Sequence, residues 1–103
     1  MADALTINVS DEGSKKLVEL VGRLDTNTSP MLEEAANGLY NDQVNDIIVE
    51  MGQCEFVSSA GLRVIVAMQK HATVGGSLVF RNVRSDVMDV FDMTGFNKIL
   101  TFE

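Results

Sequence analysis

Two stretches near the start of the chain have the hydrophobic pattern of β-strands. Residues 5–9 (LTINV) alternate apolar and polar side chains with a period of two, and residues 17–21 (LVELV) form a second apolar segment. The polar residues 10–15 between them indicate a turn. The pattern therefore predicts a β-hairpin.

The next patterned segment has helical spacing over residues 30–40. Ser29 is the expected N-cap, and Pro30 occupies the first helical position, where its missing N–H costs nothing. Near the end of the chain, another helix is expected to begin at Ser85, which can act as its N-cap, and to end at Gly95.

Between these two helices, residues 59–72 have a helical pattern in which only Arg63, Gln69 and Lys70 are clearly polar. Arg63 and Lys70 mark one narrow polar face, at about 100° per residue. The apolar arc that remains is wider than one contact with a sheet requires. It is therefore either deeply buried or partly a surface for a partner.

Three further segments predict strands. Residues 46–51 (DIIVEM) form a short β-branched run of the kind found in strands buried on both faces, and residues 52–56 lead out of it. Residues 78–80, which follow the turn at Gly75-Gly76, and residues 99–102 complete the set. The order β-β-α-β-α-β-α-β predicts an α/β fold with a mixed sheet, because parallel strands need crossover connections that are usually helical.

Length and composition narrow the class of protein. A chain of 103 residues with 46% hydrophobic and 22% charged residues fits one globular domain over residues 1–103. The net charge of −7 argues against sequence-independent nucleic-acid binding, which needs basic residues on the phosphates. Residues 1–9 have no export-signal pattern, and no run approaches the roughly 18 apolar residues of a membrane span. With one cysteine, Cys54, the expectation is a soluble protein of the reducing cytoplasm.

The usual residues of catalysis are sparse. Cys54 and His71 are single, so neither has a nearby partner for metal binding, and Cys54 as a nucleophile would have only the distant His71 as base. Gly75-Gly76 lacks the spacing of a phosphate-binding loop. We therefore expect no enzyme activity, no metal and no cofactor.

The segment 56–62 (FVSSAGL) places two hydroxyls and a glycine at the turn from a strand into a helix. The start of a helix presents unpaired N–H groups and the positive end of its dipole. Ser58 or Ser59 is therefore either only an N-cap or the acceptor of a phosphate at a site suited to an anion.

At this point the chain resembles the STAS domain family, and in particular its stand-alone anti-sigma factor antagonists. The resemblance covers nearly the whole length and rests on four segments in order. These are residues 22–25 (GRLD), 56–63 (FVSSAGLR), 75–78 (GGSL) with Val83, and 90–96 (VFDMTGF). It implies a STAS fold, with a mixed sheet of four to five strands and helices packed mainly on one face.

The resemblance also implies a function in signal transduction and transcription regulation by partner switching. In this family the unphosphorylated antagonist binds an anti-sigma factor that is also a serine kinase, and the sigma factor is released. The kinase, which holds the ATP, phosphorylates the antagonist, and a serine phosphatase of the PPM type reverses the modification. No nucleic acid or membrane is implied as a partner.

Particular residues take roles by this resemblance. Ser59 falls on the phosphoacceptor position, and Ser58 is a secondary candidate because it stands where many relatives have an aspartate. Asp25 matches an aspartate near the acceptor; it either contacts the partner or only bonds the backbone of its own turn. The rest of the predicted partner surface comprises Ala60, Gly61, Leu62 and Arg63. An alternative within the same family is a STAS subunit of a transporter or lipid-transport ATPase complex.

Overall fold

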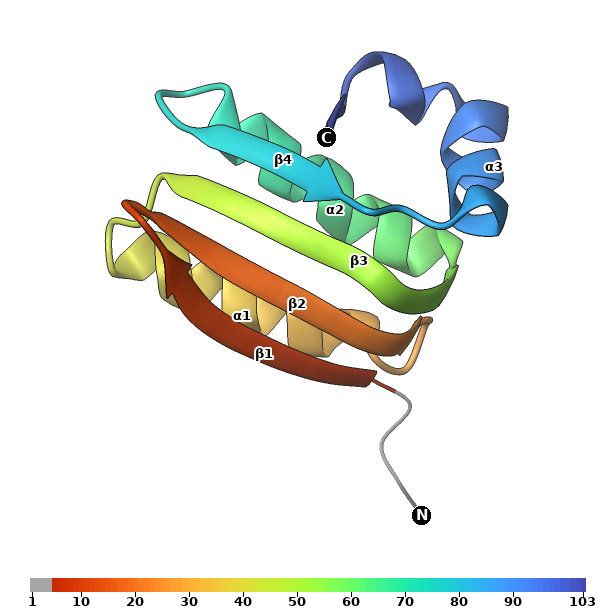
Figure 1. Cartoon of the computed structure of the whole chain (residues 1–103), viewed down its shortest axis with the longest axis horizontal. Coiled ribbons are helices and arrows are strands. Elements are labelled where there is room, and N and C mark those ends of the chain that lie inside the picture. Colours follow the sequence, from red (N-terminus) through yellow and green to blue (C-terminus); the bar gives the residue numbers. More distant parts are fainter. Residues whose placement is uncertain (1–4) are drawn as a thin grey trace.

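The computed structural model describes residues 5–103 and has the element order that the sequence predicts. Five strands and three α-helices alternate as expected, and a short 3₁₀ helix precedes the last strand (Figure 1). The elements are β1 (Leu5–Glu12), β2 (Lys15–Leu24), α1 (Ser29–Asn41), β3 (Asp46–Val57), α2 (Ser59–Ala72), β4 (Ser77–Arg81), α3 (Ser85–Thr94), η1 (Phe96–Lys98) and β5 (Thr101–Phe102). The prediction about an export signal in residues 1–9 concerns in part residues 1–4, which lie outside the described range.

The strands form one mixed sheet in the order β1-β2-β3-β4-β5. The first pair is antiparallel, and β2, β3, β4 and β5 pair in parallel. This confirms the mixed α/β sheet. The β2–β3 register shifts between Glu19 and Val21 and again between Gly22 and Arg23, so both strands are irregular toward their carboxyl ends.

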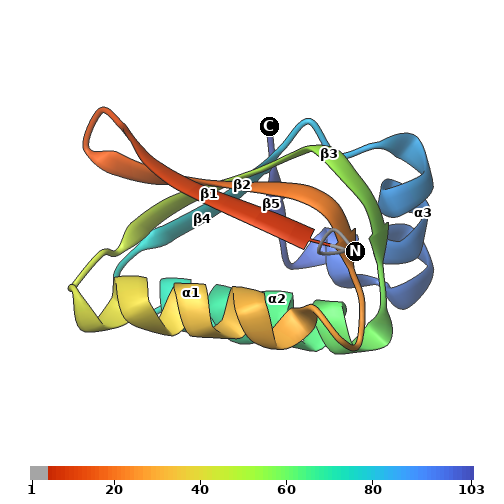
Figure 2. The ribbon, with the colours of Figure 1, turned by 90° about the horizontal axis from the view of Figure 1, so that it is seen from below.

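Two helices cover one face of the sheet. Figure 2 shows α1 and α2 side by side under the sheet and α3 at one end, next to the last part of β3. Side chains from the sheet and all three helices share one core, and many of them are almost fully buried. The largest include Leu20, Leu24, Leu32, Ile65, Phe80 and Phe91. The prediction that the helices pack mainly on one face is therefore confirmed.

Several strand boundaries differ from those expected. The polar turn is shorter than residues 10–15, because Glu12 pairs with Lys15 and only Gly13 and Ser14 remain outside the ladder. Gly13 has a φ of +63°, which glycine adopts without a Cβ penalty. Residues 52–56 do not lead out of β3 but belong to it, and residues 99–100 lie outside β5.

The expected N-caps of α1 and α3 are both wrong by one residue. The N-cap of α1 is Thr28, and Ser29 is the first helical residue; its hydroxyl donates to the carbonyl oxygen of Asp25. The N-cap of α3 is Arg84, so Ser85 already lies inside the helix. In both places the serine precedes the apolar run as a cap would, but another residue has the extended or boundary conformation.

Candidate functional site

The predicted phosphoacceptor region lies where β3 ends and α2 begins. Ser58 is extended, with φ −89° and ψ 174°, and its hydroxyl oxygen accepts a hydrogen bond of 3.2 Å from the N–H of Gly61. Its own N–H donates to the carbonyl oxygen of Leu24 on β2, at 2.9 Å. Ser58 is therefore the N-cap of α2 and also attaches the helix start to the neighbouring strand.

Ser59 has a different environment although it is the next residue. It is the first residue of α2 and is exposed, and its hydroxyl has no hydrogen-bond partner within residues 5–103. Among the described residues, therefore, Ser59 presents an exposed hydroxyl without a hydrogen-bond partner, whereas the Ser58 hydroxyl accepts from Gly61. The N-cap interpretation applies to Ser58.

Gly61 brings the start of α2 into close contact with the end of β2. A Cβ atom at this position would lie 2.8 Å from Cγ and 2.9 Å from the carbonyl oxygen of Leu24. Real side chains do not approach a backbone oxygen so closely, so only glycine fits here without displacement. The position of Ser59 relative to β2 depends on this contact.

The residues of α2 that were predicted to contact a partner differ in how far they are buried. Ser59 and Arg63 are exposed, and Ala60 is partly exposed. Gly61 and Leu62 are buried, and Leu62 belongs to the hydrophobic core. The structure therefore places three of these five helix residues where their side chains can reach another molecule.

Asp25 lies in the loop between β2 and α1. Its Oδ1 accepts hydrogen bonds from the N–H groups of Asn27 and Thr28, both at 3.0 Å. The backbone hydrogen bond from Thr28 is the main cause that lowers the pKa of the Asp25 carboxyl group below its usual value. The other oxygen, Oδ2, lies 4.0 Å from Nε of Arg23. The turn interpretation of Asp25 is thus observed, and its contact with a partner stays a prediction.

Two open hollows lie on either side of Arg63. One, of about 300 Å³, lies between α2 and the end of α3. It is lined by Ser59, Leu62, Arg63, Val66, Thr94 and Phe96. The other, of about 270 Å³, lies between α1 and α2, and its lining includes Thr26, Glu33, Ala60 and Arg63. Sequence reasoning did not place Thr94 and Phe96 at the site, although both stand in the closing segment that carries the family resemblance.

A second feature that the sequence did not reveal is an arginine stacked on an aromatic ring. The guanidinium carbon of Arg23 lies 4.3 Å from the ring centroid of Phe56, its register partner on β3. Phe56 is partly exposed, at 37%. The pair lies near the ends of β2 and β3: Arg23 is two residues before Asp25, and Phe56 is two residues before Ser58. Only the strand register, which the sequence pattern does not give, brings the two residues together.

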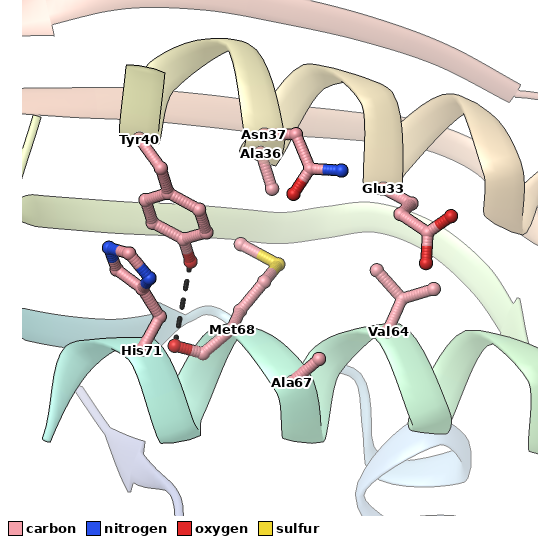
Figure 3. A pocket seen from close by; sticks show the side chains of 8 residues that line it. All are labelled: Glu33, Ala36, Asn37, Tyr40, Val64, Ala67, Met68 and His71. Atoms are coloured by element: carbon pink, nitrogen blue, oxygen red, sulfur yellow. Dashed lines mark hydrogen bonds between the residues drawn. The ribbon is translucent and has the colours of Figure 1, made fainter. Parts of the chain in front are cut away.

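Cys54 and His71 lie in separate environments. Cys54 is fully buried in β3, and burial raises the pKa of its thiol. His71 is exposed near the end of α2 and stacks on Tyr40 of α1, with ring centroids 3.6 Å apart, beside a small hollow of about 150 Å³ (Figure 3).

Within residues 5–103 no group of three or more histidine, cysteine, aspartate or glutamate side chains could hold a metal ion. In the same range no helix is long and apolar enough to cross a membrane.

Comparisons with known proteins agree on one family. A family model described as "Mlab, STAS domain" matches residues 7–101. The anti-sigma-F factor antagonist RsfB of Mycobacterium tuberculosis is 27% identical over 78 residues, which are 76% of this chain and 62% of the relative. The match thus spans less than two thirds of that relative's length.

Solved structures share the fold at lower sequence identity. An anti-sigma factor antagonist from Mycobacterium paratuberculosis has a TM-score of 0.87 and 22% identity, covering 95% of this chain and 84% of that one. The anti-sigma factor antagonist SpoIIAA in its unphosphorylated form has a TM-score of 0.79 and 17% identity, covering 95% and 88%. The Bacillus SpoIIAA in its phosphorylated form has a TM-score of 0.73 and 16% identity, covering 95% and 91%.

Proposed function

This chain belongs to the STAS domain family, and on that basis we propose that it is one STAS domain that acts as an anti-sigma factor antagonist. In this proposal the unphosphorylated chain binds an anti-sigma factor with serine kinase activity and so releases a sigma factor. The named relative RsfB supports this assignment. The proposed location is the cytoplasm, where the kinase has access to ATP.

The single observation that carries the proposal is that the hydroxyls of two adjacent serines have different environments. Ser58 uses its hydroxyl to cap α2, whereas the hydroxyl of Ser59 is exposed and has no partner within residues 5–103. A kinase can therefore modify Ser59 without removing the cap. The N–H groups of the first turn and the helix dipole favour an anion at this position.

The proposed reaction is phosphoryl transfer from ATP held by the kinase. Oγ of Ser59 attacks the γ-phosphorus, the bond to the leaving ADP oxygen breaks, and the hydroxyl proton passes to a base of the kinase. A PPM-type phosphatase hydrolyses the phosphoserine with water and restores the hydroxyl. This chain contributes the acceptor and its geometry, while the partners contribute the catalysis.

The phosphate adds about −1.5 to −2 charges at pH 7, at the centre of the proposed contact surface. A partner surface shaped for a hydroxyl would have to desolvate this charge, which costs several kcal/mol and lowers affinity by about 100-fold or more. The fold itself can stay intact. The similarity of this chain to both the unphosphorylated and the phosphorylated form of SpoIIAA supports this view.

Incubation with an anti-sigma serine kinase from the same genome and ATP tests the acceptor. Intact mass should rise by one phosphate, and peptide mapping should place it on Ser59. A phosphate on Ser58 alone, or one that is still added after Ser59→Ala, would show that the acceptor is assigned to the wrong residue.

We also expect the isolated chain to be no enzyme. The highly purified protein should neither hydrolyse ATP nor phosphorylate itself, because within residues 5–103 no side-chain group could hold a metal ion and Cys54 is buried. Product formed above a no-protein control, and lost together with the protein on further purification steps, would contradict this expectation.

A second candidate is a STAS subunit of a transporter or lipid-transport ATPase complex. It stays open because the matching family model is described as "Mlab, STAS domain" and not as an antagonist. The gene neighbourhood separates the two functions. A kinase and a phosphatase nearby favour partner switching, and a permease and an ATPase favour transport.

A further inference from the structure

Arg63 lies one helical turn after Ser59 on the same face of α2. Residues four apart are neighbours on a helix surface, and long side chains on a helix point back toward its N-terminus. The side chain of Arg63 can therefore reach the turn that carries Ser59. Both residues are exposed and line the same hollow of about 300 Å³.

The positive charge of Arg63 is not paired with a carboxylate among the described residues. Within residues 5–103 it takes part in no ion pair within 4.0 Å and in no hydrogen bond, whereas Arg81 pairs with three carboxylates, those of Glu12, Glu50 and Glu103. Glu33 is an acidic residue that lines a hollow together with Arg63, yet the two form no ion pair. A cation near the start of a helix is slightly unfavourable, because it faces the positive end of the dipole.

The turn of α2 that carries Ser59 has no acidic side chain of its own; on neighbouring elements, Asp25 follows the Leu24 carbonyl that binds Ser58, and Glu33 of α1 lines a hollow with Arg63. The first turn of α2 contains no aspartate or glutamate, although the chain has 15 acidic residues and a net charge of −7. Acidic side chains are otherwise favoured at this position of a helix. Among the described residues 5–103, Arg63 is thus a cation without a counter-ion, one helical turn from a serine whose hydroxyl has no hydrogen-bond partner.

We propose that Arg63 is the internal counter-ion of the phosphate on Ser59: a positioning residue that folds back one turn and holds the phosphoryl oxygens against the start of α2. Arginine and phosphate form strong, often bidentate hydrogen bonds. This inference rests on the proposed modification of Ser59 and adds a step to the switch. Phosphorylation would both introduce negative charge and withdraw an exposed cation from the partner surface.

The experiment measures the second pKa of the phosphate by ³¹P NMR. Phosphoserine is placed at position 59 during translation, so that no kinase is needed, and the phosphorus shift is followed from pH 4 to 8. An arginine beside the phosphate favours the dianion and lowers this pKa below the ordinary value of about 6. Arg63→Gln should raise it by about 0.15 to 0.4 units, and Arg63→Lys should recover at least part of the lowering.

Lys70→Gln is the matched control, because Lys70 is another exposed cation of α2 but lies about three turns from Ser59. It should leave the phosphate pKa unchanged within about 0.1 unit, since distant exposed charges are screened. Circular dichroism verifies that each variant is folded, and Arg63→Met, which keeps the aliphatic stem, replaces Arg63→Gln if that variant unfolds.

An unchanged pKa in Arg63→Gln, or an equal rise in Lys70→Gln, would overturn the proposal. The first result would mean that the guanidinium stays in solvent, and the second that only net charge matters. Either result leaves the kinase assignment of Ser59 intact. Conversely, absence of phosphate on Ser59 after kinase treatment would remove the proposed function without altering the ³¹P result.

Discussion

At the scale of single residues, Ser58 and Ser59 are chemically identical and structurally different. Ser58→Ala removes the acceptor for the Gly61 N–H and should lower the free energy of unfolding by about 1 kcal/mol, with a range of about 0.5–2. Ser59→Ala should change it by no more than about 0.5 kcal/mol, because the Ser59 hydroxyl has no hydrogen-bond partner within residues 5–103. Urea unfolding of both variants gives the two values.

Each of these variants is the control for the other, since both remove one hydroxyl from neighbouring positions. Equal losses of stability, or a larger loss in Ser59→Ala, would contradict the assignment of Ser58 as the cap. The assignment of Ser59 as the free hydroxyl would then also be wrong.

Asp25 is a residue whose role should depend on pH. Its folded-state pKa is lowered, chiefly by the backbone hydrogen bond from Thr28, so its carboxylate stabilises the fold above the unfolded-state pKa of about 3.9. This contribution is lost as the pH falls through the lowered folded-state pKa. Asp25→Asn keeps an acceptor oxygen but loses the charge, so the variant should be less stable than wild type at pH 7.

The difference between wild type and Asp25→Asn should then shrink below about pH 4 and nearly vanish once the aspartate is protonated. Thermal unfolding of both proteins from pH 7 to pH 2.5 gives this difference directly. A gap that stays constant over the whole range would show that the charge of Asp25 does not stabilise the turn.

At the scale of secondary-structure elements, the packing of the start of α2 against the end of β2 determines where Ser59 lies. Gly61→Ala would place a Cβ 2.9 Å from the Leu24 carbonyl oxygen, so the helix start must shift, at a cost of about 1–3 kcal/mol in stability. Gly38→Ala is the matched control in α1, where a Cβ meets no atom within 4 Å. It should stabilise the protein by about 0.5–1 kcal/mol.

The two glycine variants are compared by urea unfolding, and opposite signs are expected. A neutral or stabilising Gly61→Ala would mean that the contact between α2 and β2 is loose. In that case Gly61 would not fix the position of the acceptor.

Most of these elements are readable from the sequence because each has one buried face. Alternation over residues 5–9 and helical spacing over residues 30–40 gave the correct element types, and their order gave the mixed sheet. The second half of β3 was missed because residues 52–56 mix glycine with polar and apolar residues, and only one of these five residues, Cys54, is buried. The local pattern there does not resemble a strand, and the pairing with β2 maintains it.

The candidate site was less readable than the fold. Its central turn was found through the hydroxyl pair and the family resemblance, but the different roles of Ser58 and Ser59 depend on one hydrogen bond that no pattern reveals. The stacking of Arg23 on Phe56 depends on strand register, and the hollow that Phe96 and Ser59 both line depends on how α3 and η1 pack. These are long-range contacts, which sequence periodicity does not encode.

At the scale of the whole molecule, the β3–α2 turn and the β2–α1 loop lie at the same end of the sheet, with α3 beside them (Figures 1 and 2). The carboxyl ends of parallel strands are where α/β folds commonly bind their ligands. Ser59 lies on the surface at this end, so a phosphate there alters the surface and leaves the core unchanged. Phosphorylation at this position would therefore switch binding locally, without rearrangement of the sheet.

The most direct test is isothermal titration calorimetry of wild type, Ser59→Asp and Ser59→Ala against the anti-sigma kinase, with melting curves of the three proteins alongside. The account predicts nearly equal melting curves, tight binding by wild type and Ser59→Ala, and binding at least about 10-fold weaker for Ser59→Asp, which is a partial mimic of the phosphate. Equal affinities for wild type and Ser59→Asp, or a Ser59→Asp domain that is unfolded, would contradict it.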